Sequence, residues 1–171
     1  MQKVSELVGK AIVSSDNGER LGRVADVLLD TQSNRVLGLV IAGGAFGSEQ
    51  VLPFADVQTL GADAVVARTS KGVLAAKQWR QQGIDSARSS NLNHKRVLTT
   101  GGRAIGEIRD VLLDDAAGVV EAFEVVSPGR LGGLMQRRGL LQQDGEVRIG
   151  ADAVLVSEAA AAALEEPGRY S

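Results

Sequence analysis

Several residue types are scarce or missing, and each absence narrows what the chain can be. There is no cysteine, which excludes disulfides, thiol catalysis and cysteine-ligated zinc. His94 is the single histidine, so a two-histidine metal site is excluded as well. No Gly-x-Ser-x-Gly motif accompanies it. We therefore expect His94 to be a surface residue without a catalytic role.

Long apolar runs and an excess of one charge are also missing. The longest mostly apolar stretch, residues 36–48, contains four glycines and is shorter than the ~20 residues of a membrane-spanning helix. The N-terminus has no apolar run of the kind found in secretory signals. The formal net charge is −2, which excludes a bulk polycation that coats nucleic acid but not a local basic patch. We expect a cytoplasmic protein with no transmembrane segment.

The chain repeats itself. Residues 61–65 recur identically at 150–154, and the segment at 22–30 matches 106–114. Weaker matches join 5–7 with 90–92 and 10–13 with 95–98. Because these landmarks keep the same order, the sequence indicates a tandem duplication. We place copy one at residues 1–84 and copy two at residues 85–171. The offset between the copies grows from 84 to 89 residues, so copy two holds about five extra residues.

Each copy is typical of short strands separated by turns. In copy one, apolar and β-branched runs predict strands at residues 12–15, 23–29, 35–42, 50–54 and 64–68. The period-two pattern around Glu124 predicts a half-buried strand in copy two. Good helix formers predict a helix at 72–82, and a Ser-Glu start predicts another at 157–164. The polar run at 85–90 is interpreted as the linker. We predict a mainly β fold of two small closed or nearly closed barrels, each followed by a short helix.

The repeated unit resembles the PRC-barrel family. The residues that carry the resemblance in copy one are Leu7, Gly9, Lys10 and Ile12, the run Gly22-x-Val24-x-Asp26 to Asp30, and the strands at 36–41 and 51–54. Copy two is more divergent, with His94 in place of Gly9 and Gln142 where Pro53 aligns. The resemblance implies a small β-barrel that serves as an interaction module. The family includes the cytoplasmic part of the photosynthetic reaction centre H subunit and the C-terminal domain of a ribosome maturation factor.

Repeated acidic and glycine positions invite two interpretations. Asp26, Asp30 and their matches Asp110 and Asp114 have the oxygen atoms that a divalent cation prefers. However, Asp side chains at strand ends commonly accept hydrogen bonds from nearby backbone N–H groups. We favour a structural turn role for Asp30, Asp114, Gly22 and Gly106. For Asp26 and Asp110, an ion pair with a basic neighbour such as Arg23 or Arg109 is a structural alternative to metal binding.

The extra residues of copy two form a glycine-rich segment in which arginines alternate with apolar residues. Arginine offers forked donors and methionine an adaptable apolar surface, so this segment is a candidate for partner binding, with the glycine loop around residue 46 as a second contact. A hairpin whose leucines fold back on the barrel is the alternative. The candidate partner-binding residues are Phe46, Arg130, Leu131, Leu134, Met135, Arg137 and Arg138.

These observations favour a non-catalytic protein-protein interaction module, an adaptor built from two PRC-like barrels. We predict no catalytic residues, no cofactor-binding residues and no metal site. The expected partner is a protein whose identity the sequence does not specify, and homo-oligomers are compatible with the pattern. One alternative is an RNA- or ribosome-associated factor. Another is a metal-binding or photosynthesis-related electron-transfer accessory protein.

Overall fold

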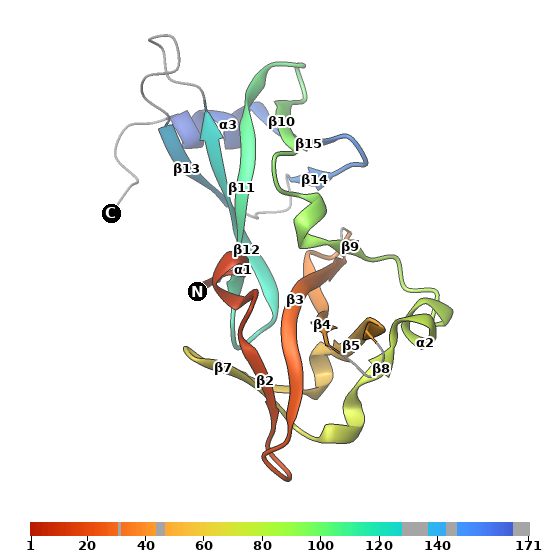
Figure 1. Ribbon diagram of the computed structural model, residues 1–171. Coiled ribbons are helices and arrows are strands. Elements are labelled where there is room, and N and C mark those ends of the chain that lie inside the picture. Colours follow the sequence, from red (N-terminus) through yellow and green to blue (C-terminus); the bar gives the residue numbers. More distant parts are fainter. Residues whose placement is uncertain (31, 44–46, 128–136, 143–146, 166–171) are drawn as a thin grey trace.

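A computed structural model describes residues 1–30, 32–43, 47–127, 137–142 and 147–165. The described residues are mainly β, as the strand-rich sequence predicts, with a few short helices (Figure 1). Two long antiparallel hairpins form the centre of the molecule, one from each copy, and they lie end to end. Their inward-facing side chains share one apolar cluster that includes residues of both copies, among them Leu39 and Phe123.

Copy one contributes the elements from β1 to α2. The strand predicted at 35–42 is confirmed as β4, and Pro53 closes β5 as a strand end. The expected helix at 72–82 is shorter, because the chain first forms a 3-10 turn and a two-residue strand. The elements are β1 (Gln2–Lys3), α1 (Val4–Leu7), β2 (Ala11–Ser14), β3 (Arg20–Asp30), β4 (Arg35–Ala42), β5 (Gln50–Pro53), η2 (Phe54–Asp56), β6 (Val57–Leu60), β7 (Ala64–Ala67), η3 (Ser70–Gly72), β8 (Leu74–Ala75) and α2 (Ala76–Gln81).

Copy two repeats the order of the main strands, and the 3-10 turn η4 stands where copy one has α1. Its last helix, α3, begins where Ser157 Oγ accepts a hydrogen bond from Ala160 N at 3.0 Å, so the predicted serine cap is present. No described strand of copy two corresponds to β8. The elements are β9 (Ala87–Arg88), η4 (Ser89–Asn91), β10 (Arg96–Thr99), β11 (Ala104–Asp114), β12 (Val119–Ser127), β13 (Arg137–Gln142), β14 (Arg148–Ile149), β15 (Ala153–Val156) and α3 (Glu158–Glu165).

The strands of both copies join one sheet. Its order is β14-β15-β10-β11-β12-β4-β3-β2-β7-β6. This order is symmetric about its centre, because each strand of one copy stands as far from the β12–β4 pair as its equivalent in the other copy. Within each copy the first and last main strands are parallel, β2 with β7 and β10 with β15. The sheet is not closed, so two separate closed barrels are not confirmed. Within the described part of the chain, the end strands β6 and β14 pair only with β7 and β15, so both ends of this order stay open.

Gly22 and Gly106 lie inside strands, and the prediction that they form turns is wrong. Each stands beside a bulge, in β3 and in β11, where the neighbouring strand comes very close. A Cβ atom on Gly22, whose φ is +145°, would lie 2.9 Å from the carbonyl oxygen of Ala42, and one on Gly106 would lie 2.6 Å from that of Val126. Close approach of two strands therefore requires glycine at both positions.

Candidate functional site

The two copies meet where the tips of their long hairpins pair. Val36 N donates to the Gly118 carbonyl at 2.8 Å, and Val120 N donates to the Asn34 carbonyl at the same distance. Between these bonds Arg35 lies opposite Val119. Arg35 and Val119 occupy equivalent positions in the repeat, as do the two donors and the two acceptors. The copies are therefore related by an approximate two-fold axis that passes through this pair.

The N-terminal strand of each copy pairs with a strand of the other copy. β1, which begins copy one, pairs with β11 of copy two at Leu112 and Leu113. β9, which begins copy two, pairs with β3 of copy one at Leu28 and Leu29. Figure 1 shows α1 in the middle of the molecule, beside the β11–β12 hairpin and away from most of copy one. The segment at 85–90 is thus part of an interface, and its interpretation as a simple linker is wrong.

Serines on the exchanged segments hold a buried aspartate of the opposite copy. Asp110, 7% exposed, accepts hydrogen bonds from Ser5 Oγ and, at 3.2 Å, from Ser5 N. It also accepts from the backbone N–H of Val111 at 2.9 Å. A buried carboxylate needs such donors, because it loses its hydration on folding. The Ser5–Asp110 clamp therefore ties the start of copy one to copy two.

The equivalent clamp ties the start of copy two to copy one. Asp26, 4% exposed, accepts from Ser90 Oγ at 2.5 Å and from Ser90 N at 3.2 Å. Val27 N donates to it at 2.8 Å, as Val111 N does to Asp110. Ser89 Oγ adds a further bond at 2.5 Å, so Asp26 has one donor more than Asp110. A cavity of about 290 Å³ lies between the two clamps and is lined by residues of both copies.

The expected ion pair of Asp26 with Arg23 is wrong. Arg23 Nη1 donates instead to the Gly9 carbonyl at 2.7 Å, and the partners of Asp26 are serines and backbone N–H groups. The sequence carried a signal for these partners, because Ser5 and Ser90 match at nearly the same repeat spacing as Asp26 and Asp110. Among the described residues, no three histidine or acidic side chains lie close enough to hold a metal ion.

Asp30 and Asp114 each organise the turn at a hairpin tip. Asp30 Oδ1 accepts from Gln32 N at 2.8 Å and Oδ2 accepts from Ser33 Oγ at 2.5 Å. Asp114 Oδ1 accepts from two backbone N–H groups, those of Ala116 and Ala117, both at 2.8 Å. These bonds stabilise the ionised carboxylates and therefore lower both pKa values. The main cause is the Ser33 hydroxyl for the pKa of Asp30 and the Ala117 N–H for the pKa of Asp114.

The outer side of the sheet differs sharply between the copies. In copy one, β8 and α2 cover it, and Trp79 is only 6% exposed against Leu28, Val40 and Val51. We call these three covered residues the copy-one face. β8 pairs with the outer edge of β5, and Ala76 N donates to the Glu49 carbonyl at 3.1 Å. The fold of copy one therefore seals its own face with a strand and a helix.

In copy two the equivalent positions carry Glu124 for Val40 and Leu140 for Val51. Leu140 is 38% exposed, and Arg138 lies beside it on β13. The strand predicted around Glu124 is confirmed as β12. Glu124 itself is buried, and Lys3 Nζ pairs with it at 3.0 Å while Arg138 Nη1 approaches it to 3.8 Å. We call Lys3, Glu124, Arg138 and Leu140 the copy-two face.

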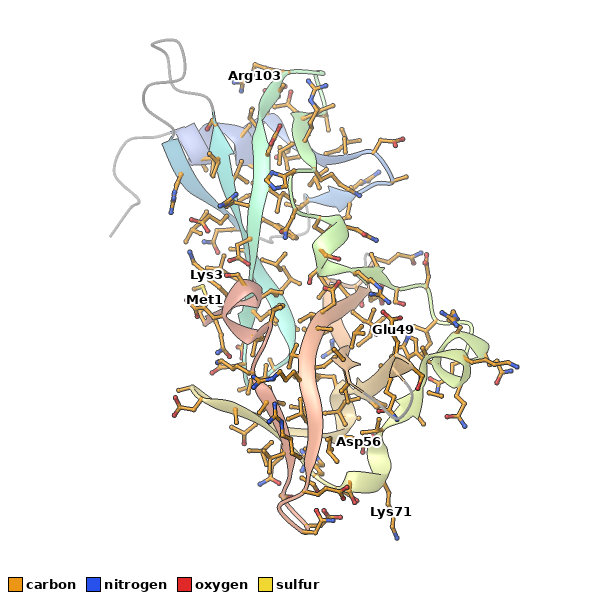
Figure 2. All side chains as sticks on the ribbon, viewed as in Figure 1. Met1, Lys3, Glu49, Asp56, Lys71 and Arg103 are labelled. Carbon is orange, nitrogen blue, oxygen red and sulfur yellow. The ribbon has the colours of Figure 1, made fainter. Side chains whose placement is uncertain are left out.

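The charge at the rim is reversed between the two faces. Glu49, the equivalent of Arg138, forms an ion pair with Arg88 at 2.7 Å. The Arg88 hydrogen bond is the main cause that lowers the pKa of Glu49, and the charge of Arg80 on α2 acts in the same direction. In Figure 2, Lys3 and Glu49 lie on opposite sides of the central strands, so the rims of the two faces are well separated.

Most of the predicted partner-binding residues fall outside the described residues, namely Phe46, Arg130, Leu131, Leu134 and Met135. Arg137 and Arg138 begin β13, and Arg138 belongs to the copy-two face. His94 is exposed, with Nδ1 3.8 Å from Glu107, and its φ is +64° where its equivalent Gly9 has +91°. None of the helices formed by the described residues is long and apolar enough to cross a membrane.

Comparison with known proteins agrees with the repeat. The chain is 27% identical over 78 residues to the probable sporulation protein YlmC of Bacillus subtilis (strain 168). That alignment covers 42% of this chain and 96% of the Bacillus protein, so the relative is about the size of one copy. The PRC-barrel domain family matches twice, over residues 1–74 and 84–162. The chain therefore belongs to the PRC-barrel domain family and carries its domain in two tandem copies.

Proposed function

We propose that this protein is a non-catalytic adaptor that binds another protein through the copy-two face. The observation that carries the proposal is the difference between two equivalent surfaces on one chain. The copy-one face is covered by β8 and α2, whereas the copy-two face presents Leu140 and Arg138 to solvent. Leu140 is a single exposed apolar side chain, so the support comes from its contrast with the sealed copy-one face and from the neighbouring Arg138, a residue type enriched in protein interfaces.

The clamps between the copies support a binding role in preference to a catalytic one. Asp26 and Asp110 are the most deeply buried carboxylates among the described residues apart from Glu124, and serine and backbone donors occupy their oxygens. Carboxylates held in this way stabilise an interface. The result is a single frame in which both faces are fixed relative to each other, as an adaptor requires.

The sequence-based candidate segment at 129–139 overlaps the copy-two face, because Arg138 belongs to both. Its last residues form the beginning of β13. A partner bound at Leu140 would meet residues on the strand that this segment enters.

Affinity capture with two matched variants tests the adaptor function. Tagged full-length protein in its native cells should retain a partner that Leu140→Ser loses and Leu155→Ser keeps. Leu155 is the matched control, because it is a leucine on a strand of copy two with 41% exposure, outside the copy-two face. Loss of the partner from both variants alike, or no partner that depends on Leu140, would contradict the proposal.

A further inference from the structure

We propose that the partner binds the copy-two face with a strand followed by a helix, as β8 and α2 bind copy one, and that it carries an acidic residue where Arg80 stands. The inference rests on the adaptor function proposed above and names the partner's segment. The inference is based on the chain itself, because copy one shows which kind of segment binds at the equivalent surface. Such a segment makes three kinds of contact, namely backbone pairing, apolar contact and charge.

The first step is the strand edge. On copy one, β8 pairs with β5 at Gln50 and Val51, whose equivalents on β13 are Gly139 and Leu140. Within the described part of the chain, β13 pairs with β12 alone. The helix α3 contributes Ala161 to the inner apolar cluster, so it packs on the inward side of β13. An edge of this kind binds an extended peptide through its main chain.

The second step is the apolar contact. Trp79 reaches the copy-one face from α2 and, at 6% exposure, is nearly covered there. The copy-two residues equivalent to Leu28, Val40 and Val51 are Leu112, Glu124 and Leu140. Leu112 and Glu124 are already buried, at 6% and 7% exposure, so Leu140 is the contact point that stays accessible. No described aromatic side chain packs on it. A partner helix that follows a paired strand would place an aromatic residue over Leu140. Large aromatic residues in such positions supply much of the affinity of protein interfaces.

The third step is charge, which makes the surface selective. Arg80 follows Trp79 on α2, and its charge stabilises the ionised form of Glu49. The equivalent of Glu49 is Arg138, so an arginine at the position of Arg80 would be repelled on copy two. A carboxylate there would be attracted. The charge reversal therefore makes the copy-two face favour an acidic residue at this position over the arginine of the chain's own β8–α2 segment.

The chain's own segment provides the probe. A fluorescein-labelled peptide of residues 72–83 carrying Arg80→Glu should bind the full-length protein saturably in an anisotropy titration. Adding Trp79→Ala to that peptide, or Leu140→Ser to the protein, should weaken binding about tenfold, because each removes the buried apolar contact. Leu155→Ser in the protein should leave the affinity unchanged.

A charge swap makes the test specific to the copy-two face. The unsubstituted peptide, which keeps Arg80, should bind the wild-type protein about fivefold more weakly than the Arg80→Glu peptide, since exposed ion pairs have modest effects. Protein carrying Arg138→Glu should reverse this order of affinities. Displacement of α2 from copy one would produce no such reversal, because residue 138 is not part of that face.

Absence of saturable binding by the Arg80→Glu peptide would overturn the inference. The inference would also be overturned if neither Leu140→Ser nor Arg138→Glu in the protein changed the affinity for the peptides. The two proposals remain distinguishable. If Leu140→Ser releases the cellular partner but no peptide binds, the adaptor function stands and the strand-helix segment is wrong. If no partner depends on Leu140, yet the peptides behave as expected, the surface binds such a segment but the cellular role is wrong.

Discussion

The Ser5–Asp110 clamp gives a quantitative prediction about how the copies are held together. Ser5→Ala removes the hydroxyl donor and leaves Asp110 Oδ2 without a partner, while Ser5 N and Val111 N still bind Oδ1. A hydrogen bond to a charged group contributes about 1.5–3 kcal/mol, and leaving its acceptor buried incurs the desolvation penalty. We therefore expect Ser5→Ala to lower the free energy of unfolding by about 2 kcal/mol.

Asp110→Ala removes three accepted bonds but also the cost of burying the charge. The two effects partly cancel, so we expect a loss of about 2–4 kcal/mol. The double variant should lose less than the sum of the single losses, because after Asp110→Ala the serine has no carboxylate left to bind. A coupling of at least about 1 kcal/mol is expected for groups in direct contact.

Urea unfolding followed by far-UV circular dichroism measures these free energies. Ser33→Ala is the matched control, because Ser33 Oγ donates to Asp30 in an exposed turn within one copy. Its cost should stay near 0.5 kcal/mol, as for exposed polar pairs. The reasoning is refuted if Ser5→Ala costs no more than Ser33→Ala, or if Ser5 and Asp110 show a coupling below about 0.3 kcal/mol.

Three further predictions concern turns and backbone strain. His94→Gly should raise the free energy of unfolding by about 0.5–1 kcal/mol, measured in urea, because its φ of +64° strains a side chain but not glycine. Gly118→Ala should lower it by more than about 2 kcal/mol, since a Cβ atom there would overlap the Phe54 ring. The depressed pKa values of Asp30 and Asp114 favour folding above about pH 4, and this contribution is lost as the pH falls through the folded-state pKa values. Asp114→Asn should therefore flatten the fall in the urea midpoint between pH 6 and pH 3; an unchanged profile would contradict this explanation.

The strands were predictable where sequence pattern and burial agree. Residues 35–42 form an uninterrupted apolar run and become β4, a strand with most of its residues buried. β6 was not predicted, because its sequence, Val57-Gln58-Thr59-Leu60, has apolar residues at its ends only. Tertiary pairing with β7 makes it a strand in spite of this weak local signal.

The interface between the copies could not be predicted from local pattern. The run at 85–90 is polar and serine-rich, which is typical of linkers, yet Ser89 and Ser90 bind a buried carboxylate more than 60 residues away. The period-two pattern around Glu124 correctly predicted β12, but not the burial of Glu124 itself, which Lys3 reaches from the exchanged strand β1. Both features come from long-range contacts that no window of sequence contains.

Joining two copies in one chain has a consequence that two identical chains do not share. In a symmetric dimer of one repeat, both outer faces have the same residues and bind the same ligands. Here the positions equivalent to Val40, Glu49 and Val51 have become Glu124, Arg138 and Leu140. The hairpin tips and both clamps have equivalent hydrogen bonds in the two copies. The arrangement of the two copies is thus kept symmetric, although the residues of the two outer faces differ. The chain's own Trp79 helix covers the copy-one face, whereas Leu140 and Arg138 of the copy-two face stay exposed, a difference that a symmetric dimer of one repeat could not have.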